Sequence, residues 1–381
     1  MLHLLPTTAS GPNADVNIST NGSDNALLPA KLCIALSGGA DSTFLLYMLN
    51  LMLENGYDSR IDIAAAIVDH GLRPESSIEA EAVKAYVQDR LSINEDKVVI
   101  LRWIGDKPKS NIHAIARRAR YKLLAEFCRK NEILHLLTGH QQDDQAETVL
   151  LRIARGSGIA GLTGIGEVVA LNDPAVLNGD AAASMDSFIK HYRPTTTRLI
   201  RPLLTFTREE IENTLNSEGI AYVMDPSNSN ERFDRVKTRQ MLRQWHMIEP
   251  QIPARLSLLA KNATRCENFL QKCLQEAENR ICQFPPNGTA LINMADFLNL
   301  HEELALRLLR CVIQRIGSKG NSGMVTTIPR LRSLERLHGI IQKFARRMDD
   351  SPPRLCVTLG GCIFSSCKSA YSIVVRREIT R

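Results

Sequence analysis

Short apolar runs alternate with amphipathic helical stretches from residue 31 to residue 155. The runs at residues 31–36, 61–68, 97–103 and 133–138 are expected to be strands, and the stretches at 43–53, 79–91, 111–130 and 142–155 are expected to be helices. Strands that alternate with helices at this spacing need right-handed crossovers. The pattern therefore predicts an α/β fold with a doubly wound, mostly parallel sheet, in which ligands bind beyond the carboxyl ends of the strands.

The flanking regions have other patterns. Residues 1–30 contain no Lys or Arg and many Gly, Pro, Asn, Ser and Thr, so they lack the features of a secretory or mitochondrial leader and are expected to form a disordered tail. Residues 169–197 are irregular, as expected of a surface insertion. Helices are expected after Pro250, and residues 354–377 have the alternation of a β-hairpin. We therefore expect a catalytic domain at 31–249, a helical domain at 250–320 and a small α+β domain at 321–381.

Composition excludes several classes of protein. A chain of 381 residues that is 44% hydrophobic and 23% charged is neither mainly disordered nor collagenous nor a coiled coil. Its formal net charge of +6 is compatible with nucleic-acid binding without requiring it. No stretch approaches the roughly 18 apolar residues of a membrane span, so no membrane partner is expected. Nine cysteines without a CxxC pair indicate reduced thiols of a cytoplasmic protein, with no zinc site or iron–sulfur cluster.

A glycine-rich loop follows the first expected strand. Two glycines allow a sharp turn, and the backbone N–H groups that the turn frees, together with the helix N-terminus behind them, can bind an anion. The loop has no Lys, so it is not the loop that grips a transferred γ-phosphate, and its aspartate is better placed to reach a bridging Mg²⁺. A capped turn without a ligand is the structural alternative. The loop residues are Ser37, Gly38, Gly39, Ala40, Asp41 and Ser42.

Ionisable residues follow two other expected strands. Asp69 and His70 end the second strand, at the edge where ligands are expected. After the fourth strand, acidic residues three and four positions apart occupy the first turns of a helix, so one face can present two carboxylates. The alternative is that these acids only stabilise the helix N-terminus through its dipole. With a nearby histidine, we expect a catalytic cluster of His140, Asp143, Asp144 and Glu147.

Basic residues gather in two segments. Nine Lys and Arg oppose two acids between residues 101 and 130, where Arg117 and Arg120 are three positions apart and lie beside Tyr121. These side chains are expected to hold phosphate or an extruded base, the alternative being a solvated helix face. A second basic cluster contains Arg232, Arg235, Lys237, Arg239 and Arg243.

Together these motifs resemble those of the N-type ATP pyrophosphatases and, within that group, the tRNA(Ile)-lysidine synthetase family. The resemblance covers residues 31–243 densely. The motifs besides the glycine loop are VDHGLR at 68–73, ARRARY at 116–121, TGHQQDDQAET at 138–148, RGSG at 155–158, RPLL at 201–204 and DPSN at 225–228. Where family members tend to have Arg-Asn, this chain has Arg235-Val236, a departure that weakens any role for residue 236.

The resemblance implies a fold like that of adenine nucleotide alpha hydrolases and an ATP-dependent reaction. ATP would adenylate the wobble cytidine of tRNA(Ile) with a CAU anticodon, and L-lysine would displace AMP to form lysidine, with pyrophosphate released. The later domains would bind the tRNA. Asp41, His140, Asp143, Asp144 and Glu147 would be catalytic. Residues 37–42 with Asp69 and His70 would bind ATP, and Asp41 and Asp144 would hold Mg²⁺. The residues expected to bind tRNA or substrate are Arg117, Arg120, Arg201, Asn228, Arg235 and Arg239.

Two other functions remain open, and so does a homodimer. Another enzyme of the superfamily, a tRNA thiolase, generally needs catalytic cysteines or a CxxC pair, which this chain lacks near the expected site. A noncatalytic tRNA-binding relative would be expected to have a damaged glycine loop, whereas residues 37–42 are intact.

Overall fold

The structure is a computed structural model that describes residues 30–57, 60–91, 93–108, 110–171, 196–223, 234–317, 329–346, 355–367 and 371–378. The expected tail, except for Ala30, and most of the expected insertion lie outside these residues. Contacts divide the chain between Glu267 and Asn268 into two compact units. The domain boundaries expected at residues 250 and 321 stay a prediction.

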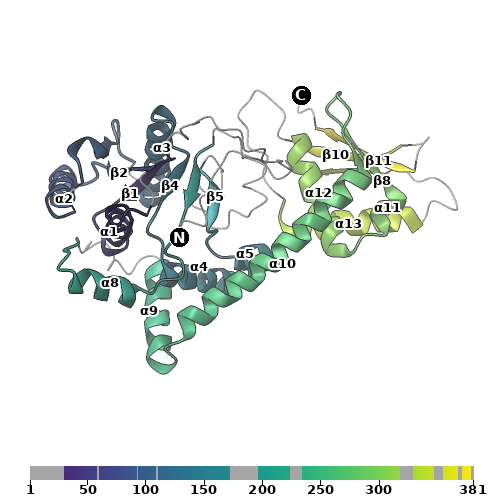
Figure 1. Ribbon diagram of the computed structural model, residues 1–381. Coiled ribbons are helices and arrows are strands. Elements are labelled where there is room, and N and C mark those ends of the chain that lie inside the picture. The colour runs from purple at the N-terminus through teal and green to yellow at the C-terminus, as the bar shows by residue number, and fades with distance from the viewer. Residues whose placement is uncertain are drawn as a thin grey trace, which may run out of the picture. The chain divides into compact units, whose positions relative to one another are not determined.

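A six-stranded sheet forms the centre of the first unit (Figure 1). Its order is β3-β2-β1-β4-β6-β5, and all neighbours are parallel except β5, which runs antiparallel to β6. The predicted mostly parallel sheet is therefore confirmed. The strands are β1 (Ala30–Leu36), β2 (Ile61–Asp69), β3 (Val98–Arg102), β4 (His135–Leu137), β5 (Val168–Ala170) and β6 (Arg198–Ile200).

Helices cover both faces of this sheet. Alternate residues of β1 point to opposite faces, so Leu32 and Ile34 belong to one buried cluster and Cys33 to another. Helices α1 (Ala40–Glu54), α2 (Ser76–Arg90) and α8 (Arg208–Ser217) pack on the first face. Helix α3 (Ile112–Lys130) packs on the second, through Tyr121 and Leu124. Buried contacts on both faces explain why the strands are almost uniformly apolar.

Most of the remaining helices of the first unit follow β4 in the chain. Helix α4 (Gln142–Ala154) leads into α5 (Ile159–Leu162), and a short 3₁₀ helix (Glu95–Lys97) precedes β3. Helix α9 (Asp234–Ile248) contacts α4, where Leu242 packs with Ala146 and Leu150. Helix α10 (Ile252–Ile281) begins in the first unit and ends in the second. No helix within the described residues has both the length and the apolar character needed to cross a bilayer.

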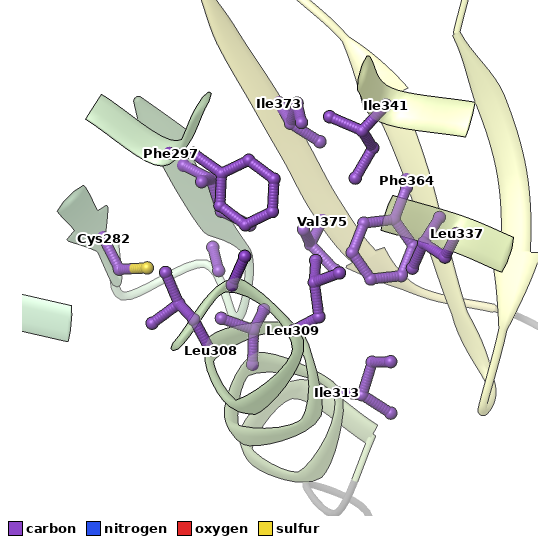
Figure 2. Close-up of a cluster of buried hydrophobic side chains, with 14 of the residues drawn as sticks. Cys282, Phe297, Leu308, Leu309, Ile313, Leu337, Ile341, Phe364, Ile373 and Val375 are labelled. Carbon is purple, nitrogen blue, oxygen red and sulfur yellow. The ribbon is translucent and has the colours of Figure 1, made fainter. Parts of the chain in front are cut away.

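The second unit combines helices with a five-stranded antiparallel sheet of order β7-β8-β11-β10-β9. Figure 2 shows its core, in which Leu309 of α12 and Leu337 of α13 lie near Phe364 of β10. The sequence predicted only a hairpin here, because β8 has four residues and pairs with β11 from about 80 positions later. The elements are β7 (Cys282–Gln283), β8 (Ala290–Asn293), α11 (Met294–Leu298), α12 (Glu302–Gly317), α13 (Leu331–Arg346), β9 (Cys356–Leu359), β10 (Cys362–Ser366) and β11 (Ser372–Arg377).

Candidate active site

The parallel sheet brings the predicted site residues to one edge. The chain leaves the carboxyl ends of β1, β2, β4 and β6 at this edge, directly before the glycine loop, His70, Thr138 and Arg201. The strand order also reverses between β1 and β4, because β2 and β3 extend the sheet one way and β4 begins the other. Such a reversal is where open α/β sheets bind ligands.

The glycine loop is closed by its own serines. The Ser42 hydroxyl donates to the Gly39 carbonyl oxygen at 3.1 Å and accepts from the Ser37 backbone N–H at 3.1 Å. Gly38 has φ of +80°, and a Cβ built there would lie 2.5 Å from a Val83 methyl carbon, so only glycine suits this position. Gly39 is the N-cap of α1 and has no side chain to cover the first amides, which suits an anion site.

A second glycine joins this loop to the end of β4. A Cβ built on Gly139 would lie 2.7 Å from the Asp41 carbonyl carbon and 2.8 Å from the Ser42 nitrogen. Real Cβ atoms do not come so close to backbone atoms, so the two segments approach each other only because residue 139 has no side chain. The approach places the start of α4 beside the start of α1.

The start of α4 is organised by a reciprocal cap. The Gln141 side-chain oxygen accepts from the Asp143 backbone N–H, while Oδ2 of Asp144 accepts from the Gln141 backbone N–H at 3.1 Å. Asp144 is thus a capping residue, whereas the sequence indicated only an interaction with the helix dipole as the structural alternative. Its other oxygen lies 4.0 Å from the Arg239 guanidinium. Asp143 lies 3.9 Å from Arg208, and both of these side chains are substantially exposed.

Arg239 of α9 is the counterion of this carboxylate cluster. Its Nε donates to Glu147, whose side chain is only 11% exposed. Burial would lower the pKa of Arg239, but the charges of Glu147, Asp144 and Asp41 outweigh burial and raise it. The ion pair therefore holds α9 against α4.

Asp41 is a partly buried carboxylate with other acidic side chains nearby. Burial raises its pKa to about 7, and the neighbouring charge of Asp144 adds to the shift. A divalent cation would relieve this repulsion, and both ligands would be hard oxygens, so the two residues fit Mg²⁺ completed by phosphate and water. Within the described residues, no group of three or more His, Cys, Asp or Glu side chains forms a metal cage.

A cavity of about 70 Å³ lies between the acidic cluster and the arginines. His140 lines it and is held through Nδ1 by the Thr138 hydroxyl at 3.0 Å. Arg201 is 2% exposed and donates to the Gly166 carbonyl oxygen. The lining residues are Arg117, His140, Asp144, Glu147, Thr148, Ile165 and Arg201. The cavity therefore presents both guanidinium and carboxylate groups to a ligand.

The two arginines of the cavity, Arg117 and Arg201, lie with Arg120 around the buried phenol of Tyr121. The Arg117 guanidinium lies 5.1 Å from the Tyr121 ring centroid. Burial would raise the pKa of Tyr121, but the charges of Arg117, Arg201 and Arg120 outweigh it and lower this pKa. Across the described residues, none of the three arginines pairs with a carboxylate, and the Nε atoms of Arg117 and Arg201 are buried without a partner. Uncompensated guanidinium groups of this kind favour an anionic ligand.

Asp69 and His70 differ in what they offer a ligand. Burial would raise the pKa of Asp69, but hydrogen bonds from Ser77 at 2.6 Å, Ser76 at 2.7 Å and the Gly71 N–H at 2.9 Å together lower it. Asp69 thus organises its own loop. His70 lies edge-on to Trp103, and burial followed by the Arg120 charge lowers its pKa. Contact of either residue with ATP stays a prediction.

Some predicted residues cannot be placed, and other residues emerge only from the fold. Asn228 lies outside the described residues, and of Arg235 only the backbone in α9 is described. Gln145 was not predicted: its amide bonds both the N–H and the carbonyl oxygen of Ile165, which positions one wall of the cavity. Its place between two predicted site carboxylates is the only signal that the sequence offers.

Comparisons with known proteins identify the domain that carries the site. A family model described as PP-loop domain matches residues 16–245, and this domain implies ATP binding. A solved structure of the U34-tRNA thiolase NcsA from Methanococcus maripaludis, with its 4Fe-4S cluster, is 18% identical and covers 64% of this chain and 75% of that one. Its TM-score of 0.48 is too low for an inference about chemistry.

Curated relatives are more similar to this chain in sequence than that structure is. The tRNA(Ile)-lysidine synthase of Wolbachia pipientis wMel is 34% identical over 352 residues, which cover 92% of this chain and 71% of that protein. The tRNA(Ile)-lysidine synthase of Rhodopseudomonas palustris is 34% identical over 344 residues, which cover 88% of this chain and 87% of that protein. With a PP-loop domain and relatives of this similarity over most of its length, the chain belongs to the tRNA(Ile)-lysidine synthase family.

Proposed function

We propose that this protein uses ATP to join L-lysine to the wobble cytidine of tRNA(Ile) with a CAU anticodon, with AMP and pyrophosphate as products. The names of its curated relatives support tRNA(Ile) and lysine as substrates. The observation that carries the proposal is the cavity that combines Arg117 and Arg201 with Asp144 and Glu147, on the ligand-binding edge of a PP-loop domain.

The glycine loop would bind the phosphates of ATP. The uncapped amides at the start of α1 favour an anion through both hydrogen bonding and the helix dipole. Mg²⁺ held by Asp41 and Asp144 would neutralise phosphate charge when bound. Without a counterion, the Asp41 carboxylate would repel the phosphates, so its position next to the loop supports a role that involves a cation.

The cavity has the two kinds of charge that an amino acid requires. A carboxylate of lysine would pair with Arg117 and Arg201, which have no acidic partner within the described part of the chain. An ammonium of lysine would pair with Glu147, beside Arg239, because Asp144 is assigned to Mg²⁺. A mixed-charge site of this kind selects a zwitterionic ligand over a simple anion or cation.

The chemistry would then proceed in two displacements. The carbonyl oxygen of cytidine attacks the α-phosphorus of ATP, which forms an O–P bond and expels pyrophosphate. The lysine ε-amine then attacks the activated carbon, a C–N bond forms, and the C–O bond breaks to release AMP. The amine must first lose a proton, and we assign its removal to His140, because an imidazole accepts protons near neutral pH and Thr138 orients this ring.

A thiolase reaction has less support. Such a reaction needs a thiol or persulfide at the site, yet no cysteine lines the cavity. Cys33 and Cys128 are fully buried in the cluster beneath α3, and neighbouring Cys128 and burial raise the pKa of the Cys33 thiol well above its ordinary value. These two thiols pack as core residues instead of forming a reactive pair.

Incubation with ATP, labelled lysine and unmodified tRNA(Ile) with a CAU anticodon tests the proposal. We expect stable label in this RNA together with equimolar AMP and pyrophosphate, and no label in methionine tRNA, which has the same anticodon. Label in both RNAs would contradict the tRNA specificity. No label in either RNA, with active protein as judged by ATP binding, would contradict the reaction.

A further inference from the structure

Helix α9 exposes an apolar stripe that the proposed reaction does not use. Met241, Trp245 and Ile248 are 43%, 36% and 85% exposed, and their spacing of four and three residues places them on one side of the helix. On another side, Arg239 pairs with Glu147, and Leu242 packs against α4. We refer to Met241, Trp245 and Ile248 as the α9 stripe.

Positive charge borders the α9 stripe at Lys237, which precedes Met241 by four residues and therefore lies on the same side of the helix. The sequence of α9 contains four Lys or Arg and one acidic residue, Asp234. Lys237 and Arg243 are exposed, and neither forms an ion pair with a described residue. An apolar surface beside the unpaired cation of Lys237 complements a ligand that is flat and apolar on one side and anionic on the other. An unpaired nucleotide has this combination, with its base and its phosphate.

Two other occupants match the stripe less well. A second copy bound symmetrically through α9 would place the same cations against each other, which like-charge repulsion disfavours. A lipid surface is bound by a helix that can lay a broad apolar face into the membrane, whereas part of the circumference of α9 is held against α4 through Arg239 and Leu242.

The α9 stripe is also close to the carboxylates of the cavity. Trp245 follows Arg239 by six residues, which is about 9 Å along a helix axis. It also follows the buried Leu242 by three residues and therefore lies where the packed side of α9 meets solvent. An enzyme that modifies a base must take it out of its stack, and the neighbouring bases then need other partners. RNA-binding proteins commonly supply aromatic side chains for this purpose.

We propose that Trp245 stacks on an unpaired base next to the modified nucleotide, while Lys237 contacts an adjoining phosphate. This inference rests on the proposed function for the identity of the RNA. Tyr57 provides a matched control, because it is the other strongly exposed aromatic side chain among the described residues of the first unit. It follows the 15-residue helix α1, about 22 Å along the helix from the glycine loop.

The test compares two RNAs with the full-length protein. One is the anticodon stem-loop of tRNA(Ile), and the other is the same stem paired throughout, without unpaired bases. Stacking contributes a factor of about 5 to 150 per base, so we expect Trp245→Ala to bind the stem-loop about tenfold more weakly and the paired stem within about twofold of wild type. Trp245→Phe keeps a ring and is expected to bind the stem-loop within about threefold of wild type.

Fluorescence gives an independent readout, because the chain has only two tryptophans. The stem-loop should quench tryptophan emission in the wild type and in Tyr57→Ala, and this quenching should be reduced in Trp245→Phe. Equal affinity of Trp245→Ala and wild type for the stem-loop would overturn the proposal, as would equal losses for both RNAs. A changed oligomeric state in Trp245→Ala would favour a second copy instead. Quenching by phosphatidylserine vesicles but not by the stem-loop would favour a lipid surface.

The proposed function can fail separately. If the wild type incorporates no lysine while Trp245→Ala loses stem-loop affinity, the stacking site stands and the reaction is wrong. If the wild type incorporates lysine while Trp245→Ala keeps its affinity, the reaction stands and the stacking site is wrong.

Discussion

The glycine-loop end of the site is held by contacts within a few residues, whereas the carboxylate end is held by residues from distant parts of the chain. Ser37 and Ser42 close the glycine loop across five positions. Glu147 is paired with Arg239, 92 positions away, and the wall beside it depends on the bond between Gln145 and Ile165. Because local contacts hold one end and long-range contacts hold the other, substitutions at the two ends should have different effects on activity and stability.

The largest effect is expected where the two ends touch. Gly139→Ala would place a Cβ 2.7–2.8 Å from the backbone of Asp41 and Ser42, which must then separate. Because misplacement of about 1 Å can cost a hundredfold in rate, we expect pyrophosphate release to fall by about that factor or more. Gly339→Ala is the control, since a Cβ there meets no atom within 4 Å. Comparable rates in the two variants would show that the approach is unimportant.

Loss of the distant counterion should destabilise the first unit next most strongly. Arg239→Ala would leave Glu147, with a side chain 11% exposed, and Asp144 without their shared partner. We expect a loss of about 3 kcal/mol in the free energy of unfolding, measured in urea. Arg208→Ala is matched to it, because the Arg208–Asp143 pair is 3.9 Å apart and largely exposed, so its loss should cost less than about 0.5 kcal/mol. Equal losses of unfolding free energy in Arg239→Ala and Arg208→Ala would mean that Arg239 does not hold α9 on α4.

Strand β4, which leads to the carboxylate end, should make the stability of the protein depend on pH. Burial and then the Arg198 charge lower the pKa of His135 to about 4, from 6.5 in the unfolded chain. Between these values the unfolded chain binds a proton that the folded chain does not, so stability is full above pH 6.5 and falls as the pH drops. We expect a loss of about 2 kcal/mol between pH 7 and pH 5. The same series with His135→Leu should be flatter, and an identical slope would contradict this assignment.

The smallest effect concerns the loop after β2. Ser77→Ala removes one of three hydrogen bonds to the buried Asp69 carboxylate, which should cost about 1 kcal/mol. It should also raise the pKa of Asp69 toward its ordinary value, so that acid unfolding begins at a higher pH. Ser217→Ala, on an exposed hydroxyl of α8, should change neither quantity measurably. If both variants behave alike in an acid titration, Asp69 does not organise its loop.

The same contrast explains what the sequence could predict. The parallel sheet, the glycine loop and the helix that presents Asp144 and Glu147 follow from local periodicity and spacing, and all appear in the structure. Arg239 was expected to bind tRNA or substrate, and its position against Glu147 depends on how α9 packs on α4, which local pattern does not encode. The hydrogen bonds that occupy Asp69 depend on how the loop after β2 folds back onto that strand.

The second unit follows the same principle. The sequence indicated α12 and α13 through their helical periodicity, and the hairpin of β10 and β11 through its alternation. Strand β8 is too short to stand out by itself, and it is a strand only because β11 pairs with it. The sequence alone therefore did not predict short strands that form only by pairing with distant segments.

Activation of the cytidine base by ATP is tested most directly by following one oxygen atom through the reaction. If ATP activates the base itself, the carbonyl oxygen of the wobble cytidine must leave with AMP. With tRNA(Ile) that carries a heavy oxygen isotope at this carbonyl, mass spectrometry should find the isotope in AMP, in equal amount to the lysine incorporated, and none in pyrophosphate. Heavy oxygen retained in the RNA while lysine is incorporated would contradict activation of the base by ATP at this site.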